Sequence, residues 1–301
     1  MSIAPHEPQP YVTDDAEGEG WRLMLGDSCE RLAEVPDESV DFTIYSPPFD
    51  SMYTYSPHPR DVGNCANRGE FLEHYGFIID ELLRVTKPGR VSAVHCMQIP
   101  ILKSRDGYTG LTDFRGQIIA EHQKRGWIYY GEVVIDKNPQ LQAVRTKAQG
   151  LMFVQLRRDS IKSRPALPDY VLLFHKPGEN AVPVKPDIDN ETWIEWARPV
   201  WFGIMEMNTL NPAPGTVESD ERHICPLQLD LIERAIRMWS NPGETVPSPF
   251  AGIGSEGYTA VRLGRKSIGC ELKPSYWAQA VANLRAIEEE MSLPTLFDGP
   301  A

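Results

Sequence analysis

The sequence predicts an α/β fold, an open and mostly parallel Rossmann-like sheet with helices on both faces. Two observations support this fold class. Short runs of β-branched and aromatic residues alternate with amphipathic stretches of helical spacing in both halves of the chain, and Pro or Gly separates most of them. The length of 301 residues is enough for one large α/β domain.

The first half of the chain is expected to begin with a flexible acidic tail, residues 1–20. This stretch is rich in proline and lacks the basic start and apolar core of a signal peptide. Residues 50–68 show no periodicity and are expected to form a long loop, which in compact domains often acts as a lid. Asp27 or Ser28 is the expected N-cap of the first helix. Strands are expected at residues 21–25, 41–45, 90–97, 126–135 and 169–175, and helices at residues 28–34, 70–85 and 114–125.

The second half is interrupted by residues 179–222, which are rich in Pro, Trp and Asn and are expected to form a small irregular insertion. Residues 21–178 and 223–291 are therefore expected to be two halves of one domain, followed by a tail at residues 292–301. The elements expected after the insertion are a helix at 226–240, a strand from Thr245, a glycine turn, a helix at 256–263, a strand at 267–270 and a helix at 275–291.

The charge of the chain is uneven. The formal net charge of −12 argues against indiscriminate coating of nucleic acid. Between residues 136 and 176, however, eight basic residues stand against three Asp, a local net charge of +5. Most of this segment, residues 136–164, is a candidate for phosphate contacts, and the alternative is a solvated face of ordinary mixed charge. The basic residues are Lys137, Arg145, Lys147, Arg157, Arg158, Lys162, Arg164 and Lys176.

The cysteines and the apolar residues bear on the cellular compartment and on membrane association. Five cysteines are scattered without a Cys-x-x-Cys pair, so we expect reduced thiols and no metal site. No run of about 18 apolar residues occurs, so no membrane span is expected. These features predict a cytoplasmic protein without a membrane partner.

The first candidate site is the motif that follows the strand at residues 41–45, Ser46-Pro47-Pro48-Phe49. Each proline fixes its own φ and removes an N–H, so the chain leaves the strand on a stiff path with unpaired carbonyls. Open α/β sheets bind ligands at the carboxyl ends of their strands. A hydroxyl, a prolyl carbonyl and an aromatic ring there suit a planar ring with an exocyclic amino group, because the two oxygens accept its hydrogens and the aromatic ring stacks on it. A strand that merely ends in a proline turn is the alternative.

The second candidate site lies about two hundred residues later, in Ser248-Pro249-Phe250-Ala251-Gly252-Ile253-Gly254. A strand runs into the glycines and a helix follows, so a ligand can approach the backbone and the free N–H groups of the helix. The next strand ends in Glu271, where a carboxylate binds the two hydroxyls of a ribose. A nucleoside-containing cofactor is predicted, and a tight turn with an exposed Glu is the alternative. Gly257 completes a Gly-x-Gly-x-x-Gly pattern, so NAD is another candidate, although no constellation for hydride chemistry accompanies it.

Together these motifs resemble the DNA amino-methyltransferases of the β arrangement, which depend on S-adenosyl-L-methionine and act on adenine N6 or cytosine N4. In that family a Gly-Asp turn and an [Asp/Asn/Ser]-Pro-Pro-[Tyr/Phe] motif precede a Phe-x-Gly-x-Gly cofactor loop. The matching residues here are Gly26-Asp27, Ser46 to Phe49, and Phe250 to Gly254. The resemblance covers roughly residues 21–176 and 221–284, in the order of the family.

The resemblance implies S-adenosyl-L-methionine as cofactor, double-stranded DNA as partner, no metal, and a target-recognition role for residues 179–222. Its setting is DNA methylation and restriction–modification in a prokaryote or phage, with a homodimer and a restriction endonuclease partner as open expectations. Catalysis is assigned to Ser46, Pro47, Pro48 and Phe49, with the base flipped out of the duplex and stacked on the aromatic ring. Cofactor binding is assigned to Asp27, Ser248, Phe250, Ala251, Gly252, Gly254 and Glu271. Phosphate binding is assigned to Arg145, Lys147, Arg157, Arg158, Lys162 and Arg164.

One residue departs from the family. The cofactor loop usually begins Asp-Pro-Phe, and its acid helps to hold the methionine amino group, but this chain has Ser248 there. Weaker cofactor binding is one expected result, unless Asp27 or carbonyls near Ser46 supply the negative charge. A catalytically impaired homologue that still binds nucleic acid is the other.

The order of the motifs bears on the substrate. A cofactor loop that follows the catalytic motif favours DNA over the RNA and protein-glutamine methyltransferases, in which it usually comes first. Ser before Pro-Pro is commoner among the enzymes of this resemblance that act on cytosine N4, whereas Asp or Asn is commoner for adenine N6. We therefore expect cytosine N4, with adenine N6 as the alternative, because both bases offer the same amino group.

Overall fold

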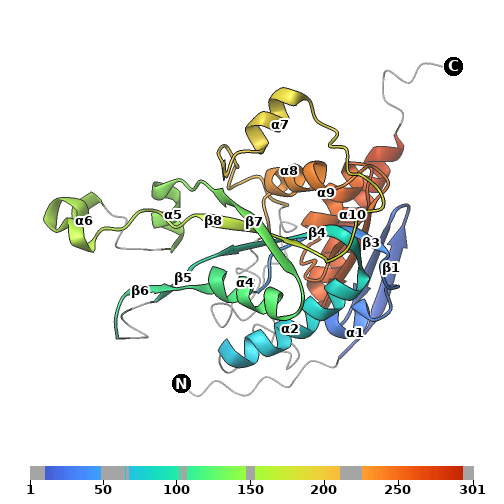
Figure 1. Cartoon of the computed structure of the whole chain (residues 1–301), viewed down its shortest axis with the longest axis horizontal. Helices are drawn as coiled ribbons and strands as arrows, with labels where there is room; N and C mark the ends of the chain where they lie inside the picture. The colour runs from blue at the N-terminus through green and yellow to red at the C-terminus, as the bar shows by residue number, and fades with distance from the viewer. Residues whose placement is uncertain are drawn as a thin grey trace.

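The computed structural model describes residues 11–48, 65, 68–101, 103, 107–146, 153–210 and 226–293. In this part of the chain two β-sheets lie side by side, and helices cover both faces (Figure 1). The predicted open, mostly parallel α/β fold is confirmed.

The first sheet has the strand order β1-β2-β11-β10. Strands β2, β11 and β10 run parallel to one another, whereas the edge strand β1 is antiparallel to β2. The expectation of a flexible tail at residues 1–20 is wrong for residues 14–18, which form the paired strand β1. Residues 1–10 lie outside the described residues. The strands span Asp14–Gly18 (β1), Trp21–Leu25 (β2), Lys266–Glu271 (β11) and Thr245–Ser248 (β10).

The second sheet has the order β3-β4-β8-β7-β9, and β3 lies beside β10. Strands β3 and β4 are parallel, β8 is antiparallel to both β4 and β7, and β9 is parallel to β7. A separate hairpin, β5 with β6, follows β4. The strands span Val40–Tyr45 (β3), Thr86–Met97 (β4), Asp169–His175 (β8), Ile128–Ile135 (β7), Val200–Trp201 (β9), Ile99–Ile101 (β5) and Gly110–Thr112 (β6).

Three helices cover each face of the sheets in the described part of the chain (Figure 1). Every residue of β3 is buried, with Phe42 and Ile44 packed toward α8 and Tyr45 toward α2, which is the pattern of a strand covered on both sides. Asp27 caps α1 as expected, accepting a hydrogen bond from Cys29 N. The helices on the Tyr45 side are α1 (Ser28–Leu32), α2 (Arg68–Val85) and α4 (Phe114–Lys124), and those on the other side are α8 (Leu229–Trp239), α9 (Ser255–Arg262) and α10 (Pro274–Ser292).

Part of the expected irregular insertion is regular. Helix α7 (Asn190–Trp196) begins after Asp189, whose carboxylate accepts a hydrogen bond from Thr192 N. Strand β9 pairs with β7 and extends the second sheet. Both elements are too short to show a period in the sequence, which explains why they were not predicted. Residues 211–222 of the insertion lie outside the described residues.

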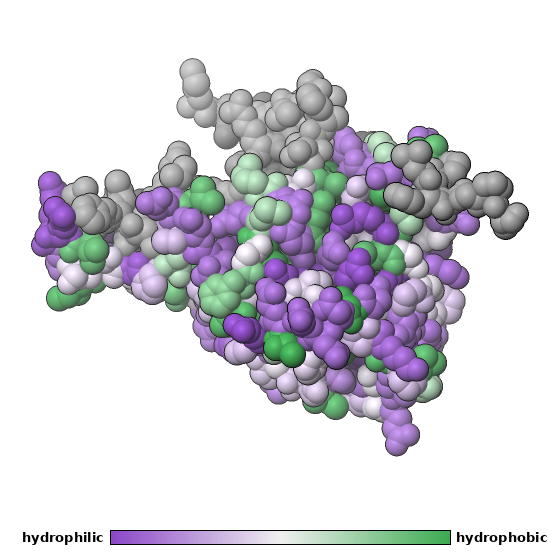
Figure 2. Space-filling view, turned by 90° about the horizontal axis from the view of Figure 1, so that it is seen from above, coloured by the Kyte–Doolittle hydropathy of each residue, from purple (hydrophilic) through white to green (hydrophobic). Residues whose placement is uncertain are grey.

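An arm connects β7 to β8 and projects from the body, at the left of Figures 1 and 2. The side chain of Gln142 anchors its base, accepting from Leu167 N at 2.7 Å and donating to the Leu167 carbonyl at 2.6 Å. The arm carries the described parts of the basic segment on α5 (Pro139–Thr146), α6 (Phe153–Arg158) and the 3-10 turn η4 (Ser160–Lys162).

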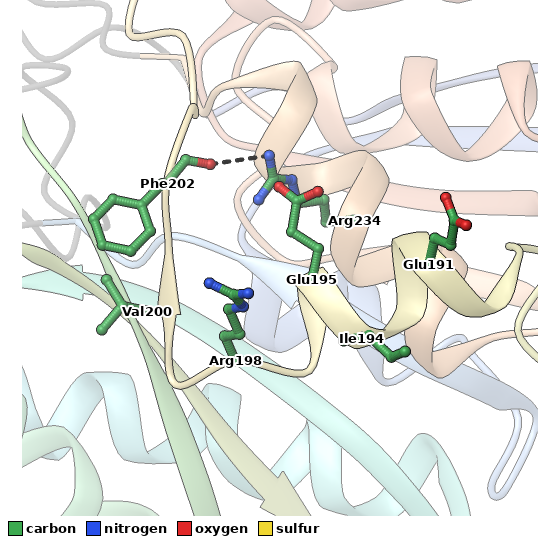
Figure 3. Close-up of a pocket in the computed structure, with 7 residues that line it drawn as sticks. All are labelled: Glu191, Ile194, Glu195, Arg198, Val200, Phe202 and Arg234. Atoms are coloured by element: carbon green, nitrogen blue, oxygen red, sulfur yellow. Dashed lines mark hydrogen bonds between the residues drawn. The ribbon is translucent and has the colours of Figure 1, made fainter.

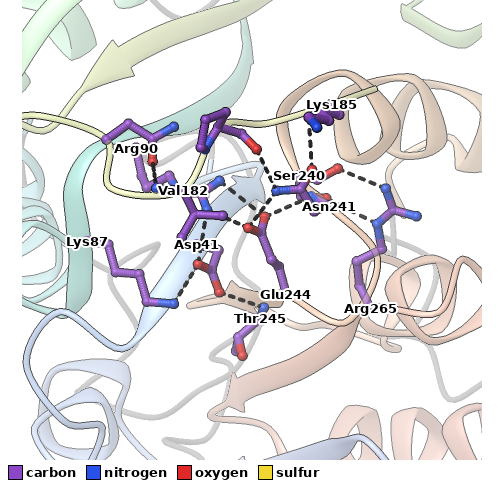
Figure 4. Close-up of polar contacts among 12 residues, drawn as sticks. Asp41, Lys87, Arg90, Val182, Lys185, Ser240, Asn241, Glu244, Thr245 and Arg265 are labelled. Atoms are coloured by element: carbon purple, nitrogen blue, oxygen red, sulfur yellow. Dashed lines mark hydrogen bonds and ion pairs between the residues drawn. The ribbon is translucent and has the colours of Figure 1, made fainter. Parts of the chain in front are cut away.

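A buried polar network joins the two sheets at the amino ends of β3 and β10 (Figure 4). The Asp41 carboxylate accepts from Thr245 N at 3.0 Å and pairs with Lys87 Nζ at 2.6 Å. Arg90 lies 3.4 Å from Asp41 and also pairs with Glu244. Because each buried charge has a partner, the network offsets its desolvation and holds the two strands side by side.

The four cysteines within the described ranges carry free thiols. Burial raises the pKa of the Cys29 thiol to about 12, so it is protonated at neutral pH. No described helix is long and apolar enough to cross a membrane. In the same part of the chain, no three His, Cys, Asp or Glu side chains gather as metal ligands would.

Candidate active site

The Ser-Pro-Pro segment leaves β3 from a buried position. The Tyr45 hydroxyl lies 2.8 Å from the Tyr75 hydroxyl, Pro47 is buried, and Ser46 is half-buried. Ser46 Oγ lies 3.2 Å from His95 Nδ1, so the hydroxyl is already tied to a neighbouring strand. Pro48 is half-buried as well, whereas Phe49 lies outside the described residues and its stacking role stays a prediction.

The glycine loop follows β10. Gly252 and Gly254 have φ angles of 53° and 88°, in the left-handed region that glycine adopts without strain. A Cβ on Gly254 would lie 3.1 Å from Ala280 Cβ, whereas no atom of the described residues lies within 4 Å of a Cβ on Gly252. Gly254 therefore permits close packing of the loop on α10, and Gly252 borders open space.

Glu271 ends β11 and organises this loop. Its Oε2 accepts from Gly252 N and its Oε1 accepts from Lys273 N, both at 2.8 Å. The Glu271 carbonyl accepts from Gly26 N at 2.9 Å, which places the Gly26-Asp27 turn beside the loop. A carboxylate oxygen can accept more than one hydrogen bond.

Two contacts bring the predicted catalytic and cofactor segments together. The rings of Tyr45 and Phe250 lie 5.9 Å apart, and Tyr45 immediately precedes the catalytic motif. Ser28 Oγ donates to the Pro249 carbonyl, so the start of α1 meets the same loop. The segments that follow β3 and β10 therefore lie at one edge of the sheets, as the sequence predicts. Phe250 itself is partly buried against Tyr45 and Tyr75.

Three buried side chains behind Ser46 were not identified from the sequence. His95 Nε2 lies 3.1 Å from Asp169 Oδ2, and the same oxygen pairs with Lys137 Nζ at 2.6 Å. Burial raises the pKa of Asp169, but the hydrogen bond from His95 and the Lys137 charge hold it below its usual value, so the carboxylate is ionised. Lys137, counted with the basic segment in the sequence, has a side chain only 9% exposed in this pair. The expected strands contained His95 and Asp169, but no local signal indicates that β4 and β8 are neighbours.

The basic residues that the sequence predicts to bind phosphate lie on the arm, as far as they are among the described residues. Arg157 and Arg158 are exposed on α6, Lys162 is exposed on η4, and Arg164 is half-buried. Arg145 lies on α5 with its side chain not described, and Lys147 falls outside the described ranges. Because the arm joins the end of β7 to the start of β8, it leaves the sheet at the edge that carries Ser46.

A hollow of about 350 Å³ lies between α7, β9 and α8 (Figure 3). Arg234 on α8 lines this hollow and donates to the Phe202 carbonyl at 3.1 Å. The lining includes none of the predicted site residues, and consists of Glu191, Ile194, Glu195, Arg198, Val200, Phe202 and Arg234.

Comparison with known proteins identifies the family. The family model described as DNA methylase, which covers the N6 and N4 amino-methyltransferases, matches residues 40–282. The chain therefore belongs to the DNA methylase family, which uses S-adenosyl-L-methionine as methyl donor. The resemblance stated from the motifs is confirmed, and NAD is set aside as the cofactor.

Two relatives are Type II methyltransferases. M.BamHI of Bacillus amyloliquefaciens is 25% identical over 285 residues, which are 88% of this chain and 57% of the relative. M1.MboII of Moraxella bovis is 44% identical over 66 residues, 22% of this chain and 25% of the relative. The chain thus spans little more than half the length of M.BamHI.

The fold is shared with solved structures. TTHA0409 of Thermus thermophilus, complexed with S-adenosyl-L-methionine, has a TM-score of 0.66 at 24% identity, over 87% of this chain and 92% of that one. The cytosine-N4-specific PvuII DNA methyltransferase has a TM-score of 0.60 at 18% identity, over 90% of each chain. These likenesses confirm the methyltransferase fold.

The loop fits the cofactor of the family. Ser248 Oγ and Ser255 Oγ have no hydrogen-bond partner among the described groups, although the two residues are only 2% and 3% exposed. A buried polar group without a partner costs about 1–3 kcal/mol, so this loop is suited to a polar ligand that would satisfy them. Open space beside Gly252 and a carboxylate at Glu271 complete the fit to a nucleoside with a polar amino-acid tail.

Proposed function

We propose that this protein transfers a methyl group from S-adenosyl-L-methionine to the exocyclic amino group of a base in double-stranded DNA, with cytosine N4 as the target. The observation that carries the proposal is the contact between Tyr45 and Phe250 at 5.9 Å. This contact brings the segment that contains Ser46 close to the loop that contains Gly252 and to Glu271. A hydrogen-bond acceptor for an amino group and a candidate nucleoside site therefore lie at the same edge of the sheets.

The reaction requires well-placed acceptors more than a strong base. The lone pair of an aromatic amine is delocalised into the ring, which makes the nitrogen a poor nucleophile. Ser46 Oγ and the Pro47 carbonyl, by accepting its two hydrogens, favour a pyramidal nitrogen with a free lone pair. When bound, S-adenosyl-L-methionine supplies the methyl group on a positively charged sulfur. The rest of the rate comes from the alignment that the rigid Pro47-Pro48 path imposes.

The amino group of a paired base cannot be reached inside a duplex, so the base must be flipped out. Phe49 is the proposed stacking platform, and the exposed cations Arg157, Arg158 and Lys162 on the arm would bind the phosphates. A homodimer and a restriction endonuclease partner stay predictions from the family.

The choice of cytosine rests on the residue before Pro-Pro. Ser46 is the residue that the family resemblance associates with cytosine N4, and the PvuII enzyme that shares the fold is cytosine-N4-specific. Adenine N6 is the second candidate, because it presents an amino group of the same chemistry.

A direct assay tests the activity and the base together. The protein is incubated with the cofactor and unmethylated DNA, which is then digested to nucleosides for mass spectrometry. We expect N4-methylcytosine from the wild type and none from Ser46→Ala. Ser292→Ala, the same change at an exposed site, is the matched control and should match the wild type. N6-methyladenine alone would identify the second candidate, and full activity in Ser46→Ala would remove the mechanism.

A further inference from the structure

Neighbouring strands deliver Ser46 and His95 to the same place. Strands β3 and β4 are parallel, with Tyr45 opposite Val94, so the next residues along the two strands are Ser46 and His95. Their side chains lie 3.2 Å apart, from Ser46 Oγ to His95 Nδ1. The contact follows from the register of two buried strands and not from a loop.

The next two strands supply Asp169 and Lys137 on the same face. His95 lies opposite Val171 of β8, and Asp169 is two residues from Val171, so it points to the same side. Asp169 in turn lies opposite Ile135 of β7, and Lys137 follows two residues later. Four adjacent strands therefore build a continuous chain of contacts that ends at the catalytic hydroxyl, and the histidine, aspartate and lysine side chains are each at most 9% exposed.

The charges decide the direction of the hydrogen bonds. Asp169 is an ionised carboxylate and accepts only, so the hydrogen in its contact with His95 is carried by Nε2. In a neutral imidazole the other nitrogen, Nδ1, is then bare and accepts. Ser46 Oγ lies at hydrogen-bond distance from Nδ1, so its hydroxyl donates. Lys137 balances the charge of Asp169.

We propose that His95, oriented by Asp169 and Lys137, is a positioning residue that makes Ser46 a hydrogen-bond acceptor for the amino group of the target base. With its hydrogen directed to His95, Ser46 presents lone pairs to the amine. A serine without this partner can turn its hydrogen toward the amine nitrogen and occupy the lone pair that reacts. The identity of the amine rests on the proposed function, whereas the direction of the hydrogen bonds does not.

The hydrogen-bond direction is tested first, in the free protein, by ¹⁵N NMR of the histidine rings at neutral pH. We expect a histidine with a protonated Nε2 and a bare Nδ1 whose signals are lost in His95→Asn. Ser46→Ala should shift the Nδ1 signal of this ring, and it identifies the ring even where His95→Asn does not fold. A bare Nε2 with a protonated Nδ1 overturns the proposal, whether or not the protein transfers methyl groups.

Single-turnover methyl transfer is the second test. His95→Ala should be at least about tenfold slower, with cofactor and DNA affinities within about twofold of the wild type. His95→Asn offers an amide oxygen to the Ser46 hydroxyl, so it should be faster than His95→Ala.

His175→Asn is the matched control, because His175 lies at the far end of β8 and should be replaceable without changing the rate. Full rate in His95→Ala, or a rate in His95→Asn no higher than in His95→Ala, overturns the inference. Absence of methyl transfer by the wild type contradicts the proposed function instead, and the NMR result then decides the hydrogen-bond direction alone.

Discussion

The ring of Tyr45 lies 5.9 Å from the ring of Phe250, across the boundary between the strand that carries the proposed catalytic motif and the strand that carries the proposed cofactor loop. Asp41 and Thr245 join the same two strands at their other ends, with Asp41 Oδ2 3.0 Å from Thr245 N. Because the strands are fixed at both ends, the sheet and not a mobile loop sets the distance between the two motifs. Sites built on rigid elements in this way keep their geometry.

Asp41 should contribute strongly to stability. It is 3% exposed and pairs with Lys87 and Arg90, so Asp41→Asn leaves buried positive charge with a weaker partner. Breaking a buried pair costs about 3–5 kcal/mol. We expect a loss of this size in urea unfolding. Asp37→Asn is the matched control, because Asp37 also pairs with an arginine but its side chain is 75% exposed, and it should change stability by less than about 1 kcal/mol. Equal losses in the two variants would contradict the role of the network.

Glu271 should govern cofactor affinity. Its two oxygens hold Gly252 N and Lys273 N, and Glu271→Gln replaces one acceptor with an amide that cannot accept. The loop then loses a hydrogen bond, and the proposed ribose site loses its negative charge. The affinity for S-adenosyl-L-methionine, measured by calorimetry, should therefore fall at least about tenfold, or about 1.4 kcal/mol. Glu289→Gln, on the exposed side of α10, should bind as the wild type does. Unchanged affinity in Glu271→Gln would place the ribose elsewhere.

The two motifs and the strands that carry them could be predicted because their signals are local. Prolines end β3, glycines with positive φ follow β10, and runs of β-branched and aromatic residues mark the strands, so the expected ranges at residues 21–25 and 169–175 agree with β2 and β8. The acidic segment at residues 14–18 was mistaken for a tail because its sequence has no strand signal. It pairs because β2 offers an edge, and Asp15 pairs with Arg22 across it at 2.8 Å.

The chain of contacts behind Ser46 could not be predicted. It requires β8 to run antiparallel between β4 and β7, and this pairing depends on residues far apart in sequence. A histidine within a strand, such as His95, is more often a packed core residue than part of a site. A lysine in a basic segment, such as Lys137, is more readily interpreted as a phosphate-binding residue. Their meeting at Asp169 is a property of the sheet register.

Ser248 should limit cofactor affinity. Its buried hydroxyl has no partner among the described groups, and Ser248→Asp restores the acid usual in the family. Burying a carboxylate is costly, so the free variant should melt at a lower temperature than the wild type. The methionine ammonium then compensates that charge, so affinity should rise about tenfold and the cofactor should raise the melting temperature more than in the wild type.

Ser248→Asn is the control of similar size without charge, and its affinity should stay near that of the wild type. Equal affinities in all three proteins would show that Ser248 does not face the amino group. Cofactor binding by Ser248→Asp with none by the wild type would favour the impaired homologue.

Glu256 should make the fold less stable as the pH rises from 4.5 to about 8. It lies in the first turn of α9 at 6% exposure, and burial, with a contribution from the charge of Glu271, raises its pKa to about 8 from 4.5. Between these values the folded protein keeps a proton that the unfolded chain releases, so this contribution to stability is complete below pH 4.5 and is lost as the pH rises to 8. The loss is on the order of 5 kcal/mol at most.

Glu256→Gln keeps the shape of the protonated side chain and does not titrate. The difference in unfolding free energy between this variant and the wild type should be small near pH 4.5 and should grow to several kcal/mol in favour of the variant by pH 8, measured by urea unfolding across that range. Taking the difference cancels every other titrating group. Glu289→Gln, at an exposed position, should show no such growth. A difference that stays constant with pH would mean that Glu256 is already ionised in the folded protein.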